Sequence, residues 1–296
     1  MADLTRLNGH NNRSLPTQVA HGAAQARLTK PGLTTGSHRP KQSGAPAPAP
    51  KVSLVIPVRN EARNIAWVLE QIVGEVTEII LVDGNSTDVT LITALRCRPD
   101  ITVVPQEGLG KGSALRTGFL AATGDIIVMM DADGSMAPTE IRHYLYFLAN
   151  GYDFVKGSRF VAGGGSLDIT ALRRFGNRFL LAVFNSLYDT DLTDLCYGFC
   201  AFHRRYLEHL ELSATGFEIE AELVAHAVHA GLRIAEVPSL ELPRRSGKSN
   251  LHAVRDGIRV LRTVLRNHRS GVSGHLTQAL SRGGGWHSAR PAASSR

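Results

Sequence analysis

Apolar residues along the chain follow two alternating patterns. Short continuous apolar runs lie next to Gly or Asp, as expected for strands that are buried on both faces of a parallel sheet. These runs are residues 52–56, 79–82, 101–104 and 126–130. Apolar positions at helical spacing predict amphipathic helices at residues 61–73, 89–96, 113–122 and 139–150. The alternation predicts an α/β fold with a mostly parallel, doubly wound sheet and helices on both faces.

The two ends of the chain differ in composition from the middle. Residues 1–50 mix Gly, Pro, Ser, Thr, Asn and Ala and end in an Ala-Pro tract, and residues 270–296 contain three consecutive glycines and a Ser/Ala/Arg end. Segments of this kind do not bury enough apolar surface to offset the entropy of ordering. We therefore predict a disordered tail at each end and a single folded domain at residues 51–269.

The positive charge of the chain belongs to these tails. The formal net charge is +7, but residues 51–269 hold 24 basic and 25 acidic side chains. Residues 1–50 hold six Lys or Arg against one acid, and residues 270–296 hold three against none. Because the domain itself is almost neutral, we expect no nucleic-acid partner.

Cysteine usage and hydropathy indicate the compartment. Cys97, Cys196 and Cys200 form no CxxC pair, and no signal-peptide pattern is present, which predicts a reduced, cytoplasmic protein. The longest apolar runs, residues 126–130 and 179–184, are far shorter than the roughly 18 residues needed to cross a bilayer. Any membrane contact is therefore expected to be peripheral.

Three of the predicted strands end in polar clusters, at the sheet edge where ligands bind in such folds. The clusters are residues 57–61, 83–88 and 131–133. Asp131 and Asp133 flank the small Ala132, so both carboxylates are expected to approach one Mg²⁺ or Mn²⁺ that also takes phosphate oxygens. A DxD string is also common in ordinary turns, but its position directly after a buried strand favours a metal site.

Other residues are candidates for ligand binding or catalysis. Asp83 is placed to accept hydrogen bonds from a nucleotide, although a plain strand-to-helix turn would explain the same cluster. Lys111 lies in a Gly-rich segment that opens a helix, which favours anion binding, with a flexible connection as the alternative. Asp194 is a candidate general base, or else a solvated loop acid.

A basic segment follows near the end of the predicted domain. Arg244, Arg245 and Lys248 lie in a Gly/Ser loop that is expected to close over phosphates. The helix predicted at residues 251–267 carries apolar side chains on one side and arginines on another. Such a basic amphipathic helix fits either docking on the fold or lying on an anionic membrane surface.

Eight strings in order carry a family resemblance: VSLVIPVRNEARNI, EIILVDGNSTD, GLGKGSALRTGF, GDIIVMMDADGS, FVKGSRF, LRRFGNR, GFCAF and RRSGKSNL. Over about residues 51–266 the chain resembles glycosyltransferase family 2, in its polyprenyl-phosphate (dolichol-phosphate) mannosyltransferase-like branch. The resemblance implies a GT-A fold. It also implies an inverting transfer of a hexosyl group from a nucleotide-diphosphate sugar, of the GDP-mannose or UDP-glucose type, to polyprenyl phosphate at the membrane surface.

The same resemblance implies roles for individual residues. Those implied to bind the donor, the metal or phosphates are Pro57, Arg59, Glu61, Asp83, Asp131, Ala132, Asp133, Arg159, Arg173, Arg174, Arg244 and Lys248. Two positions depart from the pattern of an archaeal-type member. Ser135 replaces a Gln that is an extra metal ligand, and Asn250 replaces a phosphate-binding Lys.

Three other functions fit parts of the pattern. A hydroxyl acceptor would require a carboxylate base, for which Asp194 is the candidate. A sugar nucleotidyltransferase would carry a Gly-rich, basic loop after the first strand, where this chain has residues 57–61. A non-catalytic module that binds membranes or nucleic acid through the tails would not need the DxD pair.

Overall fold

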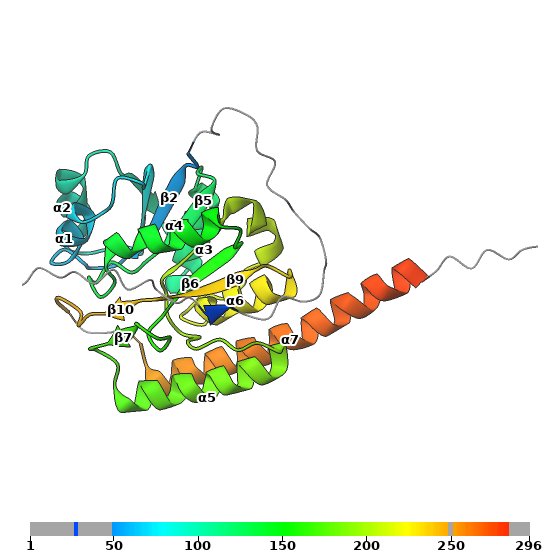
Figure 1. Ribbon diagram of the computed structural model, residues 1–296. Coiled ribbons are helices and arrows are strands. Elements are labelled where there is room, and N and C mark those ends of the chain that lie inside the picture. The colour runs from blue at the N-terminus through cyan, green and yellow to red at the C-terminus, as the bar shows by residue number, and fades with distance from the viewer. Residues whose placement is uncertain (1–26, 29–48, 248–250, 284–296) are drawn as a thin grey trace, which may run out of the picture.

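The computed structural model describes residues 27–28, 49–247 and 251–283, with side chains described for 49–247 and 251–269. Its described strands form one sheet in the order β1-β9-β6-β8-β5-β2-β3-β4 and a two-stranded ribbon of β10 and β7 (Figure 1). The strands of the sheet are β1 (Arg27–Leu28), β2 (Val52–Val58), β3 (Glu78–Asp83), β4 (Thr102–Pro105), β5 (Ile126–Met129), β6 (Phe154–Ser158), β8 (Cys200–His203) and β9 (Ile234–Pro238). The ribbon pairs β7 (Gly165–Ser166) with β10 (Leu240–Glu241).

The sheet is mostly parallel, as predicted. β2 pairs in parallel with β3 and β5, β3 with β4, and β6 with β9, whereas β8 runs antiparallel to both β5 and β6. Every residue of β5 is buried, which is why a continuous apolar run marks it in the sequence. The carboxyl ends of β2, β3 and β5 meet at one edge, and the polar clusters that follow these strands meet there too.

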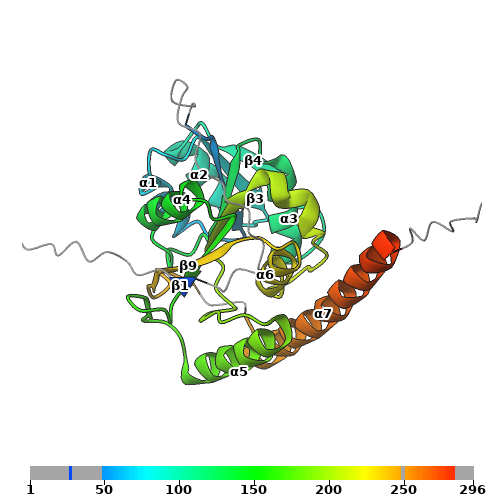
Figure 2. The ribbon, with the colours of Figure 1, turned by 45° about the vertical axis from the view of Figure 1, so that its right-hand side comes forward.

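Helices cover both faces of the sheet (Figures 1 and 2). The helices α1 (Ile65–Glu70), α2 (Thr90–Cys97) and α4 (Ile141–Ala149) pack on one face. The other face carries α3 (Lys111–Ala121), α5 (Ala171–Tyr188), α6 (Ile219–His229) and α7 (Ala253–Gly283). Alternation along β2 supplies both cores, because Leu54 and Ile56 face the first layer while Val55 faces the second.

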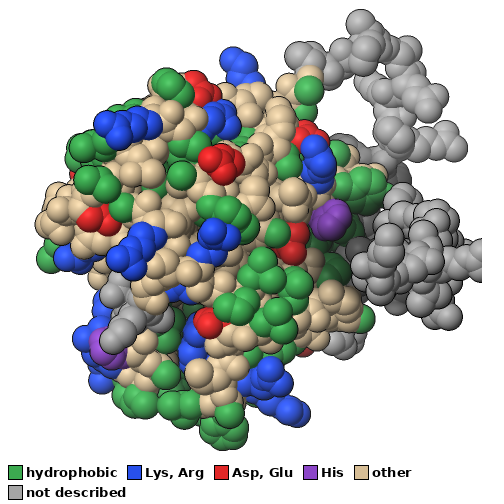
Figure 3. Space-filling view, turned by 90° about the vertical axis from the view of Figure 1, so that its left-hand side faces the viewer, with side chains coloured by type: hydrophobic (Ala, Val, Ile, Leu, Met, Phe, Trp, Pro, Cys, Tyr) green, Lys and Arg blue, Asp and Glu red, His purple; other side chains and the backbone are tan. Residues whose placement is uncertain are grey.

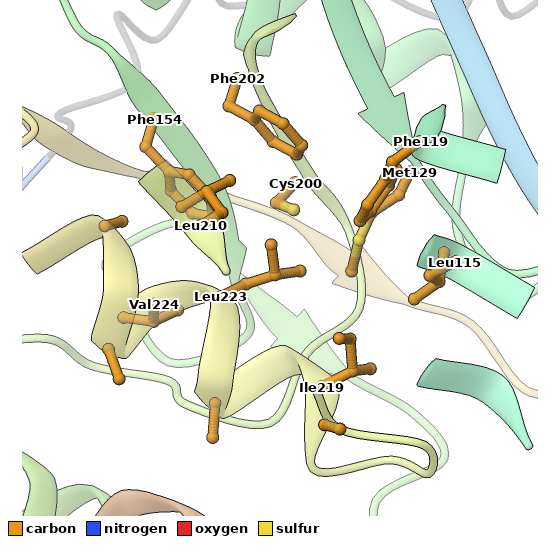
Figure 4. Close-up of a cluster of buried hydrophobic side chains, with 14 of the residues drawn as sticks. Leu115, Phe119, Met129, Phe154, Cys200, Phe202, Leu210, Ile219, Leu223 and Val224 are labelled. Atoms are coloured by element: carbon orange, nitrogen blue, oxygen red, sulfur yellow. The ribbon is translucent and has the colours of Figure 1, made fainter. Parts of the chain in front are cut away.

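An aromatic cluster ties the second layer to the sheet (Figure 4). The Phe119 ring of α3 meets the Phe202 ring of β8 edge to face, with 5.5 Å between centroids. The Phe154 ring of β6 stacks on Phe202 at 5.8 Å. Both geometries are favourable for aromatic pairs, so the antiparallel strand β8, which the sequence pattern did not reveal, is anchored by a helix and by its neighbouring strand on the same face of the sheet.

Gly118 marks the closest approach of α3 to the sheet. A Cβ atom there would clash with the Cγ1 of Val55 and lie 2.8 Å from the Cγ2 of Val82. We expect Gly118→Ala to lower the free energy of unfolding by about 1–3 kcal/mol, measured by urea denaturation, because the core must shift to admit the methyl group. Gly176→Ala is the matched control: nothing lies within 4 Å of that added Cβ in α5. It is expected to be neutral or stabilising by about 0.5–1 kcal/mol, and equal effects of the two changes would contradict this packing.

The predicted tails require two corrections. Within residues 1–50, Arg27–Leu28 form β1 and pair with β9 at the edge of the sheet; residues 1–26 and 29–48 lie outside the described part of the chain. The predicted C-terminal helix does not end near residue 267, because α7 continues to Gly283. Its isolated glycines, Gly271 and Gly274, each cost only about 1 kcal/mol in a helix, whereas Gly283 is the first of three in a row. Within the described residues, no helix combines the length and the apolar composition needed to span a bilayer.

Candidate functional site

Two adjoining cavities lie where the polar clusters meet. The larger, about 340 Å³, is lined by β-strand ends, the Gly-rich segment and the DxD pair. A smaller one of about 70 Å³ shares Lys111, Asp131, Asp133, Phe217 and Arg244 with it. Together they bring the following predicted residues to one place: Pro57, Arg59, Glu61, Lys111, Asp131, Ala132, Asp133, Arg159, Arg173 and Arg244.

A tight turn presents the DxD carboxylates to both cavities. The turn leaves the buried end of β5, and Gly134 adopts a φ of +78°, a conformation that favours glycine. A Cβ at Gly134 would also lie 2.7 Å from the Cδ of Arg245. The Ser135 N–H donates to an Asp133 oxygen at 2.9 Å and fixes that side chain. Both carboxylates therefore line the same cavities from a rigid turn.

Lys111 is held between two carboxylates. Its Nζ lies 2.6 Å from Asp131 Oδ1 and 2.8 Å from Glu220 Oε1. The segment before α6 positions it, because the Gly112 N–H donates to the Thr215 carbonyl at 2.9 Å. Burial alone would lower the pKa of Lys111, but the charges of Asp131 and Glu220 outweigh it and raise that pKa. Burial raises the pKa of Asp131 to about 6, against the opposing charge of Lys111.

Arg244 makes the corresponding contacts with the other aspartate. Its Nη2 lies 2.8 Å from Asp133 Oδ2, and its Nη1 lies 3.0 Å from Glu61 Oε1. Burial raises the pKa of Glu61, although Asn64 and Arg244 partly offset the rise. The next residue of the loop also contacts the fold, since the Arg245 guanidinium lies over the Trp67 ring, 4.3 Å from its centroid. The basic loop therefore closes over the cavity edge in this conformation.

Arg159 belongs to a buried ionic network. Its Nε and Nη2 donate to the two oxygens of Asp194 at 2.7 and 3.0 Å, and its Nη1 lies 3.2 Å from Glu241. Burial alone would raise the pKa of Asp194, but the charge and hydrogen bonds of Arg159 outweigh it and lower that pKa. The predicted role of Asp194 as a general base does not fit this geometry, because the residue is fully buried and Arg159 occupies both oxygens. Asp194 instead orients Arg159.

The remaining predicted residues are not brought to the cavities. Asp83 accepts from the Ser86 N–H at 3.1 Å, and its neighbours Gly84 and Asn85 line the larger cavity instead. Arg174 is exposed on α5 and lines neither cavity, whereas Arg173 lines the smaller one. Lys248 and Asn250 lie outside the described residues.

Two acidic residues of the site were not predicted. Glu220 and Glu241 both line the smaller cavity, where they pair with Lys111 and Arg159. Glu220 lies between apolar neighbours in α6, and a buried acid within an apolar stretch is the signal that could have revealed it. Glu241 lies between Leu240 and Leu242 and gives the same signal, but its partner Arg159, 82 residues away in the sequence, does not follow from that pattern.

The donor set fits a hard divalent cation. The described residues contain no group of three or more His, Cys, Asp or Glu side chains placed to hold a metal. Two carboxylates facing a cavity leave the other positions to water and phosphate oxygens, which is how Mg²⁺ is usually bound beside a nucleotide. Asp131 and Asp133 would hold the ion, and Ser135, which lines the same small cavity, is the neighbouring oxygen donor.

Comparison with known proteins identifies the family. The family model described as glycosyl transferase family 2 matches residues 53–211, which include all of β2 but its first residue, the DxD turn and Arg159. The chain belongs to glycosyltransferase family 2. The family resemblance read from the sequence motifs is thereby confirmed.

Relatives of the chain include a glycosyltransferase, a dolichol-phosphate mannosyltransferase and a polyprenol monophosphomannose synthase. Glycosyltransferase AglJ of Haloferax volcanii is 33% identical over 209 residues, covering 70% of this chain and 68% of that protein. A dolichol-phosphate mannosyltransferase of Pyrococcus furiosus is 30% identical over 210 residues, 68% and 59% of the two chains. A polyprenol monophosphomannose synthase of Mycolicibacterium smegmatis is 30% identical over 256 residues, 78% and 91% of the two chains.

Solved structures confirm the GT-A fold of this family 2 member. Glucosyl-3-phosphoglycerate synthase from Mycobacterium tuberculosis, with Mn²⁺, UDP-glucose and phosphoglyceric acid, is similar at a TM-score of 0.60 and 27% identity. The similarity covers 74% of this chain and 80% of that one. The same protein with Mg²⁺ and UDP gives a TM-score of 0.59 at 25% identity, over 74% and 79% of the two chains.

Proposed function

We propose that this protein is a metal-dependent, inverting hexosyltransferase that uses a nucleotide-diphosphate sugar and transfers the sugar to polyprenyl phosphate at the cytoplasmic face of a membrane. The observation that carries the proposal is the DxD pair, which faces two adjoining cavities together with Lys111, Arg244 and Arg159. Acidic and basic groups converge there as a nucleotide diphosphate and one divalent cation require.

The larger cavity supports the nucleotide side of the reaction. Pro57 and Arg59 line it from the end of β2, and Gly84 and Gly108 line it from the loops after β3 and β4. A bound Mg²⁺ or Mn²⁺ would supply Lewis-acid stabilisation of the departing diphosphate. Lys111 and Arg244 border the same space, so their charges are placed to stabilise the negative charge that develops there.

A third cavity, of about 210 Å³, supports the acceptor side. It runs between α5 and α7 and is walled by apolar side chains such as Leu172, Leu180 and Val260. Its inner end shares Arg159 and Arg173 with the smaller site cavity. A phosphate at this inner end would lie beside Arg173 and near Arg159, whose N–H groups also donate to Asp194, Glu241 and the Cys196 carbonyl. Glu220 lines the same end, and a hydrocarbon would follow the apolar walls. A phosphate acceptor is already an anion and needs no general base. This agrees with the site, because both carboxylate oxygens of Asp194 accept hydrogen bonds from Arg159.

The outer surface of α5 and α7 supports the membrane location. The two helices lie side by side in both ribbon views (Figures 1 and 2). Six large apolar side chains on them are 41–72% exposed: Leu172, Phe175, Phe179, Val254, Ile258 and Leu265. Exposed arginines alternate with them, and Figure 3 shows apolar and basic side chains together at the lower end of the molecule. Apolar groups beside Arg are the pattern of a helix surface that lies on anionic lipid.

The Phe175→Ser/Phe179→Ser double variant tests this surface. We expect it to lower binding to phosphatidylglycerol-rich vesicles by about tenfold or more, because each buried Phe side chain contributes roughly 1.5–3 kcal/mol. Sedimentation of vesicles with bound protein measures the effect. The matched control is Leu120→Ser/Tyr146→Ser, on α3 and α4, where both side chains are also exposed. An equal loss in the control, or no loss in the α5 variant, would contradict the assignment.

The function itself is tested by a transfer assay. GDP-mannose, UDP-glucose and UDP-GlcNAc are each incubated with Mn²⁺ or Mg²⁺, with and without a short polyprenyl phosphate, and nucleotide release and lipid product are measured. Release that requires both the lipid and the metal would support the proposal. One of the M. tuberculosis structures holds phosphoglyceric acid, so this acid is the alternative acceptor; release that requires it instead would identify a small-molecule transferase. No nucleotide binding would reject the proposed function.

A further inference from the structure

Each aspartate of the DxD pair is bound to a cation of the protein itself. Lys111 contacts Asp131 at 2.6 Å, and Arg244 contacts Asp133 at 2.8 Å. Each of these cations also contacts a glutamate on its other side: Glu220 at 2.8 Å from Lys111, and Glu61 at 3.0 Å from Arg244. The result is two chains of carboxylate, cation and carboxylate that meet at the metal-binding turn.

We propose that these two chains couple metal binding to nucleotide binding by an exchange of partners. When a divalent cation takes the two aspartates, Lys111 and Arg244 remain anchored to Glu220 and Glu61 and turn their free N–H groups to the diphosphate. Glu220 and Glu61 are then positioning residues, which act through the cations that they hold. The inference rests on the proposed function, because it assumes that the DxD pair binds a metal together with a nucleotide diphosphate.

The charges of the cluster are consistent with the exchange. Four carboxylates face two cations, so the cluster has two more negative than positive charges, which one divalent ion balances. An ammonium 2.6 Å from an Asp131 oxygen competes with the metal for that oxygen and repels it. A diphosphate offers the ammonium another anionic partner and removes this competition. Each ligand therefore assists the other, and by linkage the assistance is equal in both directions.

The positions of the glutamates explain why the cations would not be lost from the site during the exchange. Glu220 is in the first turn of α6 and is nearly buried, and Glu61 is held by Asn64, whose Nδ2 donates to it at 2.6 Å. Neither glutamate belongs to the turn that presents the aspartates. A cation released by an aspartate therefore keeps one fixed anionic partner beside the cavity.

Binding measurements on Lys111→Met test the exchange. Mn²⁺ titrations followed by electron paramagnetic resonance give the affinity for the ion alone, and for the ion in the presence of UDP or GDP. We expect Lys111→Met to bind Mn²⁺ alone about tenfold more tightly than the wild type and to bind the nucleotide with Mn²⁺ about tenfold more weakly, within the 5–150-fold range of typical coupling. A residue with a merely structural role would not change the two affinities in opposite directions.

Two control variants and one variant of the second chain complete the test. Arg116→Met, also on α3 but contacting the Leu212 carbonyl outside the cavities, is expected to leave both affinities unchanged. Lys111→Arg keeps the charge and is expected to retain most of the coupling. Arg244→Gln tests the second chain, because it removes the charge of a loop residue and leaves the buried core unchanged. Like Lys111→Met, it is expected to strengthen binding of Mn²⁺ alone and to weaken binding of the nucleotide with Mn²⁺.

The double variant Lys111→Met/Glu220→Gln separates positioning from ligation. Glu220→Gln alone is expected to weaken Mn²⁺ binding, because Lys111 is left with Asp131 as its anionic partner. With Lys111 also replaced, Mn²⁺ affinity should return to the level of Lys111→Met. If Glu220 were itself a metal ligand, the double variant would stay weak, which would overturn the inference. An unchanged or weaker Mn²⁺ affinity in Lys111→Met would also overturn it, whereas a wild type that binds no nucleotide with Mn²⁺ would contradict the proposed function itself.

Discussion

Asp133→Asn is expected to lower metal-dependent sugar transfer by about a thousandfold, because a preorganised group that stabilises developing charge is typically worth 10²–10³ in turnover. Asp133 is the more buried of the two DxD carboxylates and is fixed by the Ser135 N–H and by Arg244. The amide keeps the size of the side chain and removes the charge that a divalent cation requires. The loss should fall on kcat/KM with each nucleotide sugar and should not be restored by raising the donor concentration to that which saturates the wild type.

A surface aspartate provides the control for this prediction. Asp100 forms an exposed ion pair with Arg98 and lines neither site cavity. Asp100→Asn should therefore retain full transfer, and both variants should unfold at similar urea concentrations to the wild type. A thousandfold loss in a folded Asp133→Asn, with Asp100→Asn unaffected, would place the effect in the site. Near-normal transfer by Asp133→Asn would show that the second carboxylate is dispensable.

The first half of the fold could be predicted from the sequence because its signals are local. β2, β3 and β5 are continuous apolar runs followed by polar clusters, and a parallel sheet collects such clusters at one edge. β6, β8, β9, α6 and the two-residue strands β1, β7 and β10 were not predicted as elements. β8 is inserted antiparallel between β5 and β6, an arrangement that depends on pairing with distant strands and on packing through Phe202.

In the candidate site too, the residues in local motifs could be predicted and their distant partners could not. The DxD pair, Arg244 and Glu61 belong to recognisable motifs, and the structure brings them together. The partners that decide what these groups do come from distant segments: Glu220 is 109 residues from Lys111. Asp194 shows the consequence most clearly. Its position suggested a base, but the Arg159 contacts that argue against this role connect residues 35 apart and become visible only in the folded chain.

Asp194→Asn is expected to lower the free energy of unfolding by about 3 kcal/mol, since breaking a buried ion pair is strongly destabilising and leaves Arg159 with Glu241, at 3.2 Å, as its remaining carboxylate partner. Arg159 and Asp194 are almost completely buried, so water does not replace the lost contact. Urea denaturation measures the change. The matched control is Glu75→Gln, which breaks the exposed pair with Arg142 at 2.7 Å and should cost no more than about 1 kcal/mol.

The same variant distinguishes positioning from general-base catalysis. If Asp194 only orients Arg159, the folded fraction of Asp194→Asn should bind the acceptor phosphate more weakly, with a raised KM for polyprenyl phosphate, because the guanidinium is no longer fixed by two oxygens. A general base would produce a different result: an unchanged KM and a loss of kcat that follows the ionisation of one carboxylate. The fully buried position of Asp194 and its lowered pKa favour the first outcome, because a carboxylate stabilised as an anion by an adjacent guanidinium is a poor proton acceptor.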